Sequence, residues 1–428
     1  MSQRQYSQKR CEVTCVNHRI TLPIKLQDYN ELRSDTAAFR HWLDTMIATY
    51  PELFPKGIEQ GYTLHDILPS SAKLPEVQWR RIRLKARDPH GRAQVFTIAS
   101  SDVLPYMTGY TDAVEKPLFL RRFGVPFWGL TYVFGRNDSY WYRLSNHLGR
   151  YEIVGTTVKT ACKLPTHLLA DEKHTHFNGH KAYLATTAGA DCILGISLAL
   201  QADEATLHTA YAQFQREARH VDPAYTPQTV NTDGWTATQK AWRGLFDTIT
   251  VIECFLHAFL KIRDRCKKRW HTRWVDIQQQ VWDIYHAPDP QAFRQRCTDF
   301  LTWARLTMTG PALQAIEKLY AKMELFVTAF AFPQAYRTSN MIDRHMQPLA
   351  RCLVQARCFH GHWHSAERQV RSWALCHNFG PYCPRARASQ QYHSPAHRLN
   401  GKVFHTNWLH NLLISSSATG LPTNHRKC

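Results

Sequence analysis

We predict an α/β fold with a parallel sheet, because strand-like and helical segments alternate between residues 228 and 270. A β-branched run at 229–232 precedes a helical pattern at 238–246, and a second β-branched run at 248–252 follows it. This alternation is typical of parallel sheets whose strands are joined by helices. The second observation is Asp233, which follows the first of these strands. Open sheets of this kind bind ligands beyond the carboxyl ends of their strands.

The first 110 residues are less informative. A helical pattern covers 28–50, and strand patterns cover 76–86 and 93–99. Turn-forming residues at 88–91 lie between the two strands. We therefore expect a small α+β region at 1–110, whose role is either structural or the binding of DNA ends.

Three short helices are predicted within 111–158. A turn at 135–138 separates the second helix from the third, which is typical of a helix-turn-helix. The region either reads DNA or is an ordinary three-helix packing unit. The predicted helices cover 113–123, 127–134 and 139–148. If the region reads DNA, the side chains expected at the groove are Arg136, Tyr140, Trp141, Arg143 and Asn146.

Strand patterns return in 159–260. An apolar run at 164–170 ends in Asp171 and Glu172, and an amphipathic helix is predicted at 202–219. A hairpin is predicted between them, with strands at 181–187 and 192–198 and a turn through Gly189, Ala190 and Asp191.

The chain after His257 is predicted to be helical as far as about residue 332. Its Trp side chains are expected in the core of this helical segment. A cluster of basic residues either lines bound DNA or forms a solvated helical face. The members of this cluster are Lys261, Arg263, Arg265, Lys267, Lys268 and Arg269.

Another acid opens the next predicted helix. In the segment TSNMIDR at 338–344, Asn340 is a suitable N-cap and Asp343 lies three residues later. This spacing also fits a capping box, so a structural role for Asp343 stays open. Pro348 is expected to kink this helix.

The C-terminal part is rich in Cys and His. These side chains are competent zinc ligands, but their spacing forms no pair of Cys-x-x-Cys knuckles. The residues concerned are Cys352, Cys358, His360, His362, His364, Cys376, His377 and Cys383. The basic segment 385–428 is predicted to be irregular.

The order of these pieces resembles the large group of DDE transposases that includes the Mutator-like elements and related bacterial insertion-sequence transposases. Asp171 resembles the acid on the first strand of that group, and Asp233 resembles the acid after the fourth strand. Cys254 and His257 resemble its Cys-x-x-His motif, which here begins 21 residues after Asp233. Asp343 resembles the third acid, which is Glu in most members. Glu172 and Asp191 compete with Asp171, and Glu367 is a fallback for Asp343.

The resemblance implies a ribonuclease-H-like catalytic core at 159–260 and 336–384, with an all-helical insertion at 261–335. It also implies an enzyme of cut-and-paste transposition, which cleaves DNA and transfers the cut strand. Asp171, Asp233 and Asp343 would bind two Mg²⁺ or Mn²⁺ ions, while Cys254 and His257 would position the DNA. The alternative is a catalytically inactive, transposase-derived DNA-binding protein, and the Asp in third position gives it weight.

Charge and hydropathy agree with a nucleic-acid partner. Among 428 residues, 53 Lys and Arg face 34 Asp and Glu, which gives a formal charge of +19. Such an excess favours a polyanion, here double-stranded DNA of the element ends and of the target. No apolar run approaches the length of a membrane span. We expect a bacterial cytoplasmic, nucleoid-associated protein whose 12 Cys are reduced, acting on DNA as a homodimer or higher oligomer.

Overall fold

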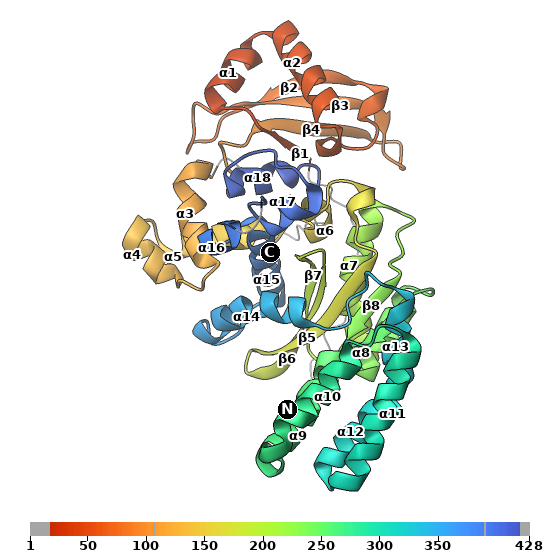
Figure 1. The fold of residues 1–428 in the computed structure, drawn as a ribbon. Helices are drawn as coiled ribbons and strands as arrows, with labels where there is room; N and C mark the ends of the chain where they lie inside the picture. The colour runs from red at the N-terminus through yellow and green to blue at the C-terminus, as the bar shows by residue number, and fades with distance from the viewer. Residues whose placement is uncertain (1–17, 106–107, 389–390, 420–428) are drawn as a thin grey trace, which may run out of the picture. The chain divides into compact units, whose positions relative to one another are not determined.

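The computed structural model describes residues 18–105, 108–388 and 391–419, which fall into two compact units. The first unit comprises 1–121, 127–160 and 371–428, and the second comprises 122–126 and 161–370. Both are mixed α/β structures, each with one sheet (Figure 1). No helix in the described ranges is both long and apolar enough to cross a membrane.

The first unit contains a four-stranded mixed sheet in the order β1-β4-β3-β2. β1 is parallel to β4, and the other pairs are antiparallel. Buried apolar side chains from the sheet and from two helices form one core. The elements are β1 (Arg19–Leu22), α1 (Leu26–Ser34), α2 (Thr36–Thr49), η1 (Pro51–Leu53), η2 (Ile58–Gln60), β2 (Tyr62–Leu68), β3 (Trp79–Arg87) and β4 (Ala93–Ser100).

The predicted helix at 28–50 is two helices, because Asp35 ends the first and caps the second. Asp35 has an extended backbone, and its carboxylate accepts hydrogen bonds from the N–H groups of Ala37 and Ala38. Asp is a preferred N-cap for this reason. The strands predicted at 76–86 and 93–99 correspond to β3 and β4, whereas β1 and β2 were not predicted.

Four helices follow in the first unit: the three predicted within 111–158 correspond to the first three, and the fourth, short helix was not predicted. Asn137 caps the third of them by accepting a hydrogen bond of 2.8 Å from the N–H of Tyr140. These helices are α3 (Thr111–Arg121), α4 (Phe127–Phe134), α5 (Asp138–Leu148) and α6 (Ile153–Thr157).

The C-terminal segment was predicted to be irregular, but its described residues form helices. The helix α18 (Trp408–Ser415) is buried along its whole length and packs against β1 and α3. Beyond it, Ser417 exchanges hydrogen bonds of 2.9 and 3.0 Å with the backbone of Thr21. The segment therefore completes the core that the N-terminal strands begin. Two shorter helices, α16 (Pro384–Ala388) and α17 (Pro395–Asn400), precede α18.

The second unit is built on a five-stranded sheet in the order β7-β6-β5-β8-β9. The first three strands of this unit, β5, β6 and β7, form an antiparallel meander, and β8 and β9 are parallel to β5. The 3-10 turn η4 (Ala161–Lys163) precedes the sheet. The strands are β5 (His167–Phe177), β6 (His180–Gly189), β7 (Cys192–Ala199), β8 (Thr229–Thr232) and β9 (Thr250–Glu253).

Two helices, α7 (Glu204–Val221) and α8 (Thr236–Leu245), pack against each other, and α7 also packs on β6 and β7. A third helix, α14 (Asn340–Gln355), packs on β5. Its helical residues continue through Pro348, which lies inside the helix. Its buried residues Ile342, Met346, Leu349 and Leu353 keep helical spacing on both sides of the proline. The last helix of this unit, α15 (Trp363–Phe379), continues into the first unit at Arg371.

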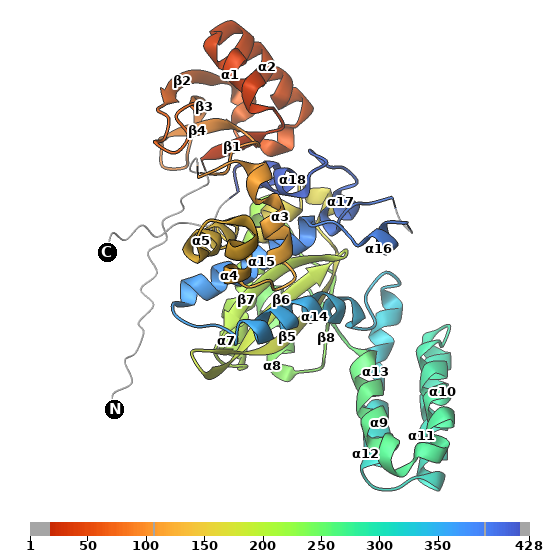
Figure 2. The ribbon, with the colours of Figure 1, turned by 90° about the vertical axis from the view of Figure 1, so that its left-hand side faces the viewer.

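The segment between β9 and α14 is a helical bundle with its own hydrophobic core, as predicted (Figure 2). Its described residues form no strand. The first helix begins at Phe255, earlier than the predicted boundary at 261. The helices are α9 (Phe255–Arg269), α10 (Trp274–Tyr285), α11 (Pro290–Thr307), α12 (Pro311–Ala321) and α13 (Met323–Val327), with short 3-10 turns η5 (His271–Arg273) and η6 (Thr328–Ala331).

Candidate active site

Strand register places Asp171 and Asp233 side by side. β5 and β8 are parallel, and Leu169 is paired with Asn231. Asp171 and Asp233 each lie two residues further along. Asp233 is the first residue after β8, and its negative charge raises the pKa of Asp171, which places the two carboxylates near each other. The predicted strand at 164–170 continues to residue 177, so Asp171 lies within β5 rather than at its end.

The electrostatics of Asp171 show that a third carboxylate is close. The pKa of Asp171 is raised to about 6. Burial is the largest cause, followed by the negative charges of Asp343 and Asp233. One carboxylate oxygen accepts a hydrogen bond of 2.9 Å from the N–H of Glu172. Asp233 and Asp343, the other two acids that the sequence selected, are thus near enough to Asp171 to affect its pKa.

Asp343 reaches this region from the first turn of α14. Ser339 Oγ donates a hydrogen bond of 3.0 Å to Asp343 Oδ2. Asn340 is the first residue of the helix and not its N-cap, so the capping box considered above does not form. Asp171 and Asp343 line a cavity of about 520 Å³, together with Lys173, Arg344 and other residues of β5 and α14.

Glu172, the nearest rival of Asp171, faces the other side of the sheet. Its Oε1 accepts hydrogen bonds from the hydroxyls of Tyr211 at 2.6 Å and Thr238 at 2.7 Å. Burial raises the pKa of Glu172 to about 7. Glu172 therefore ties α7 and α8 to the sheet, which is a structural role.

The other two rival acids also have structural contacts. Asp191 lies in the β6–β7 turn with a positive φ of 65°, and its carboxylate is 3.5 Å from His345 Nε2. Glu367 accepts a hydrogen bond of 2.6 Å from the N–H of Leu198 in β7. Since β6 separates β7 from β5, Glu367 is remote from Asp171 in the sheet.

Cys254 and His257 lie at the start of α9, beside the acids. Interaction with Cys254, followed by the charges of Cys254, Asp233 and Asp171, raises the pKa of His257 to about 9. Burial raises the pKa of the Cys254 thiol, but its contacts with His257 and Ser339 together lower it by more. His257 Nδ1 is buried and makes no hydrogen bond of standard geometry to a described residue. A cationic imidazolium near the acids follows at neutral pH.

The ligand chemistry fits a hard divalent cation. Three carboxylates supply the oxygen donors that Mg²⁺ and Mn²⁺ prefer, and their mutual repulsion favours a cation among them. Within the described residues, however, no group of three or more His, Cys, Asp or Glu side chains is already arranged to hold a metal ion. The same finding leaves the C-terminal Cys and His residues without a zinc site in the described ranges.

The expected DNA contacts of the helix-turn-helix region are only partly accessible. Arg136 and Arg143 are exposed, and Tyr140 is half-buried beneath the Arg136 guanidinium, 5.6 Å from the ring centre. Trp141 and Asn146 are buried, so these two residues are not available to a groove. The exposed apolar side chains lie instead on the preceding helix α4 and include Trp128, Tyr132 and Val133.

On α9, Lys261 and Arg265 are exposed, as DNA contacts must be. Arg263 is half-buried and pairs with Asp264 at 2.9 Å. The side chain of Lys268 lies outside the described residues, together with those of Lys267 and Arg269.

Sequence reasoning did not identify Glu253 or Ser339. Glu253 is buried at the end of β9 and forms an ion pair of 2.5 Å with Lys322. A Cβ at Gly234 would lie 2.5 Å from Glu253 Oε1, so the turn after Asp233 needs its glycine at φ +87°. That positive φ explains the Asp-Gly pair. For Ser339, the available signal was a hydroxyl four residues before a candidate acid.

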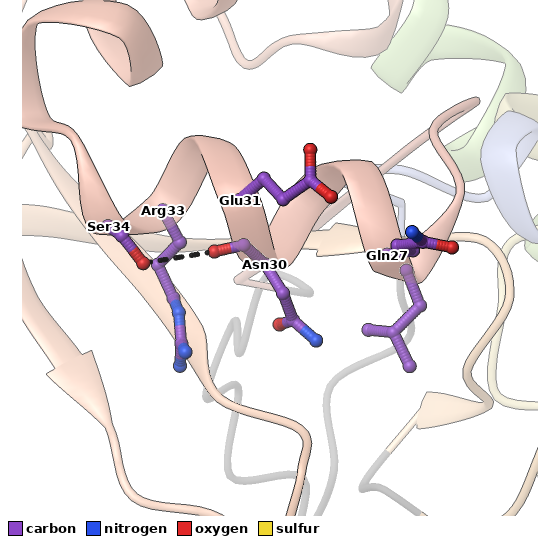
Figure 3. Close-up of a pocket in the computed structure, with 6 residues that line it drawn as sticks. Gln27, Asn30, Glu31, Arg33 and Ser34 are labelled. Carbon is purple, nitrogen blue, oxygen red and sulfur yellow. Dashed lines mark hydrogen bonds between the residues drawn. The ribbon is translucent and has the colours of Figure 1, made fainter.

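A second hollow, of about 620 Å³, lies along α1 in the first unit and is lined by Gln27, Asn30, Glu31, Arg33 and Ser34 (Figure 3). Ser34 Oγ donates a hydrogen bond of 3.2 Å to the carbonyl of Asn30. Glu31 is the single carboxylate in its lining, so the grouping of acids favours the site on β5.

No family model matches the chain. No curated protein is similar enough in sequence to count as a match.

Proposed function

We propose that this protein is a DDE/D-type transposase, which uses Asp171, Asp233 and Asp343 for metal-dependent DNA strand cleavage and strand transfer. One observation carries the proposal. Two adjacent parallel strands and a helix more than 100 residues away in sequence place three carboxylates close enough to raise the pKa of Asp171. Converging like charges of this kind are typical of functional sites.

The topology of the second unit supports this proposal. An antiparallel meander followed by two strands parallel to its first strand, in the order β7-β6-β5-β8-β9, is compatible with the ribonuclease-H-like core that the resemblance implies. The acids occupy the first strand, the end of the fourth, and the helix after a helical insertion. These are the places at which the transposase group carries its acids.

In this proposal, some residues of the site would bind metal ions and others would attract DNA. Asp171, Asp233 and Asp343 would hold Mg²⁺ or Mn²⁺, and the bound ions would supply the charge stabilisation that in-line displacement at phosphorus requires. The imidazolium of His257 would attract a backbone phosphate toward the acids. Lys261 and Arg265 would extend this attraction along α9, and Arg136 and Arg143 would contact double-stranded DNA elsewhere.

Neutral isosteres of the acids test the proposal. We expect Asp233→Asn and Asp171→Asn each to reduce cleavage by at least about 100-fold. The substrate would be labelled duplexes of the DNA that flanks the coding region, with Mg²⁺ or Mn²⁺. DNA binding should persist or tighten, because a negative charge facing phosphate is lost. Glu367→Gln is the matched control, since it keeps its acceptor for Leu198 and should cut like the wild type. Full cleavage by Asp233→Asn would refute the proposal.

The second candidate is a DNA-binding protein that does not cut. The absence of a preformed three-ligand group among the described residues favours it, as does the shorter acid at 343. Asp343→Glu separates the two functions, because it lengthens the side chain by one methylene and keeps its charge. Wild-type protein that binds duplex but never cuts, with cleavage gained in Asp343→Glu, would establish the inactive form. Cleavage by both proteins would establish the enzyme.

A further inference from the structure

The position of the Asp343 carboxylate depends on the loop that precedes α14. Asp343 lies 110 residues after Asp233, and the helical bundle of α9 to α13 occupies most of the intervening chain. A carboxylate that must act together with two strand residues needs its backbone fixed to those strands, because small displacements at a site are costly. The loop before α14 therefore has to be anchored.

Three hydrogen bonds anchor this loop to the carboxyl ends of β8 and β9. Asn231 Nδ2 donates to the carbonyl of Tyr336 at 3.0 Å. The N–H of Phe255 donates to the carbonyl of Arg337 at 3.0 Å. The N–H of Ser339 donates to Cys254 Sγ at 3.1 Å. One anchor comes from β8 and two come from the residues that follow β9. The anchored loop residues are one or two positions apart.

The last anchor continues to the carboxylate. Cys254 Sγ lies 3.4 Å from Ser339 Oγ and donates to it, and Ser339 Oγ donates in turn to Asp343 Oδ2 at 3.0 Å. Cys254 and Ser339 are 1% and 2% exposed. The serine hydroxyl has a single proton, and its hydrogen bond to Asp343 Oδ2 uses that proton, while the contact with Cys254 Sγ holds the serine oxygen in place. Burial removes the competition of water for these bonds.

We propose that Ser339 and Cys254 are positioning residues that hold the carboxylate of Asp343 in its metal-binding orientation. This inference rests on the proposed function, and it gives the Cys of the Cys-x-x-His motif a role toward the third acid. Ser339 occupies one carboxylate oxygen and leaves the other for a cation. Partners of this kind typically account for about 10- to 100-fold in metal affinity.

Removal and restoration of the hydroxyl test the inference. Ser339→Ala should raise the Mg²⁺ concentration for half-maximal cleavage about 10-fold or more, and Ser339→Thr should restore it. Cys254→Ala should have a smaller effect in the same direction, because Ser339 keeps its proton. Cys266→Ala is the matched control, since Cys266 is a buried thiol of α9 within the core of the helical bundle. Far-UV circular dichroism and thermal unfolding would verify that each variant folds.

A double-mutant comparison distinguishes positioning from general packing. If Ser339 acts through Asp343, Ser339→Ala should change Mn²⁺ affinity in the wild type but not in the Asp343→Asn background. Mn²⁺ binding is measured by electron paramagnetic resonance, without reference to cleavage. Equal, additive losses in both backgrounds would overturn the positioning role, and so would unchanged affinity in folded Ser339→Ala. Wild-type protein that neither binds Mn²⁺ through Asp233 nor cuts DNA would refute the proposed function, and the inference with it.

Discussion

Asp171 and Glu172 are consecutive residues with opposite surroundings. Asp171 faces two other carboxylates, whereas Glu172 accepts hydrogen bonds from Tyr211 and Thr238 on the other side of β5. The sequence indicated that an acid at this strand would act, but it left both residues open. Alternation along the strand decides between them, and only the register with β8 shows which face carries Asp233.

The raised pKa of Asp171 predicts that the site costs folding free energy. The folded-state pKa is about 6 against a usual value of 3.8, so the fold disfavours the charged form, fully so above pH 6. Asp171→Asn removes that charge and should raise the free energy of unfolding by about 1–2 kcal/mol at pH 8. Urea unfolding of both proteins at pH 8 measures this difference. A less stable Asp171→Asn would contradict the expectation.

The same pKa predicts how metal affinity depends on pH. Asp171 must lose its proton to bind a cation, so Mn²⁺ affinity should be constant above about pH 7 and fall below pH 6, by about tenfold per pH unit. His257, with a pKa of about 9, stays protonated throughout this range and should not contribute. A calorimetric titration between pH 5 and 8 measures the profile. Affinity that stays constant down to pH 5 would show that Asp171 is not a ligand.

At the scale of elements, periodicity predicted most helices and the strands of the second sheet. It failed where a single residue or a distant partner decides the outcome. Asp35 divides one helical pattern into α1 and α2. In α5, the amphipathic pattern located the helix but did not show that Trp141 and Asn146 face inward. The ring of Trp141 donates instead to the carbonyl of Gly135 at 3.0 Å.

The proposed DNA binding predicts a role for two exposed arginines, Arg136 just before α5 and Arg143 within it. Arg136→Glu and Arg143→Glu should weaken duplex binding about tenfold or more each, because each replaces a phosphate-attracting charge with a repelling one. They should also lower the slope of log affinity against log salt. Arg92→Glu is the control in the same unit, since Arg92 is exposed but already paired with Asp88 at 2.7 Å. Fluorescence anisotropy from 50 to 200 mM salt measures both quantities. Equal losses in Arg92→Glu would indicate a general charge effect without a local contact.

At the scale of the whole molecule, the least predictable contact joins the two ends of the described chain. Thr21 and Ser417 are 396 residues apart and exchange backbone and hydroxyl hydrogen bonds beside the buried helix α18. A local pattern cannot reveal such a contact, so the basic segment after residue 385 was predicted to be irregular. The candidate acids were found because each follows a strand or opens a helix, whereas Ser339 and Cys254 are connected only in three dimensions.

The buried helix α18 predicts that truncation damages the first unit. Ending the chain at Asn400 would remove α18 and expose Ile20 and Leu22, each of which is fully buried. Each large apolar side chain contributes roughly 1.5–3 kcal/mol when buried, so the first unit should unfold or aggregate. Proteolysis and circular dichroism of the shortened protein would reveal this. A shortened protein as resistant to proteolysis as the full chain would show that α18 is dispensable.

The hydrogen bond between the N–H of Phe255 and the carbonyl of Arg337 joins the two ends of the helical bundle. The helical bundle leaves the sheet and returns to it at neighbouring points, and it has a hydrophobic core of its own. A segment with adjacent ends can be acquired, lengthened or exchanged without moving the strands at its base. The bundle can therefore vary in length and sequence while the carboxylates keep their places, and a foreign domain with closely spaced termini can be grafted between the same two residues.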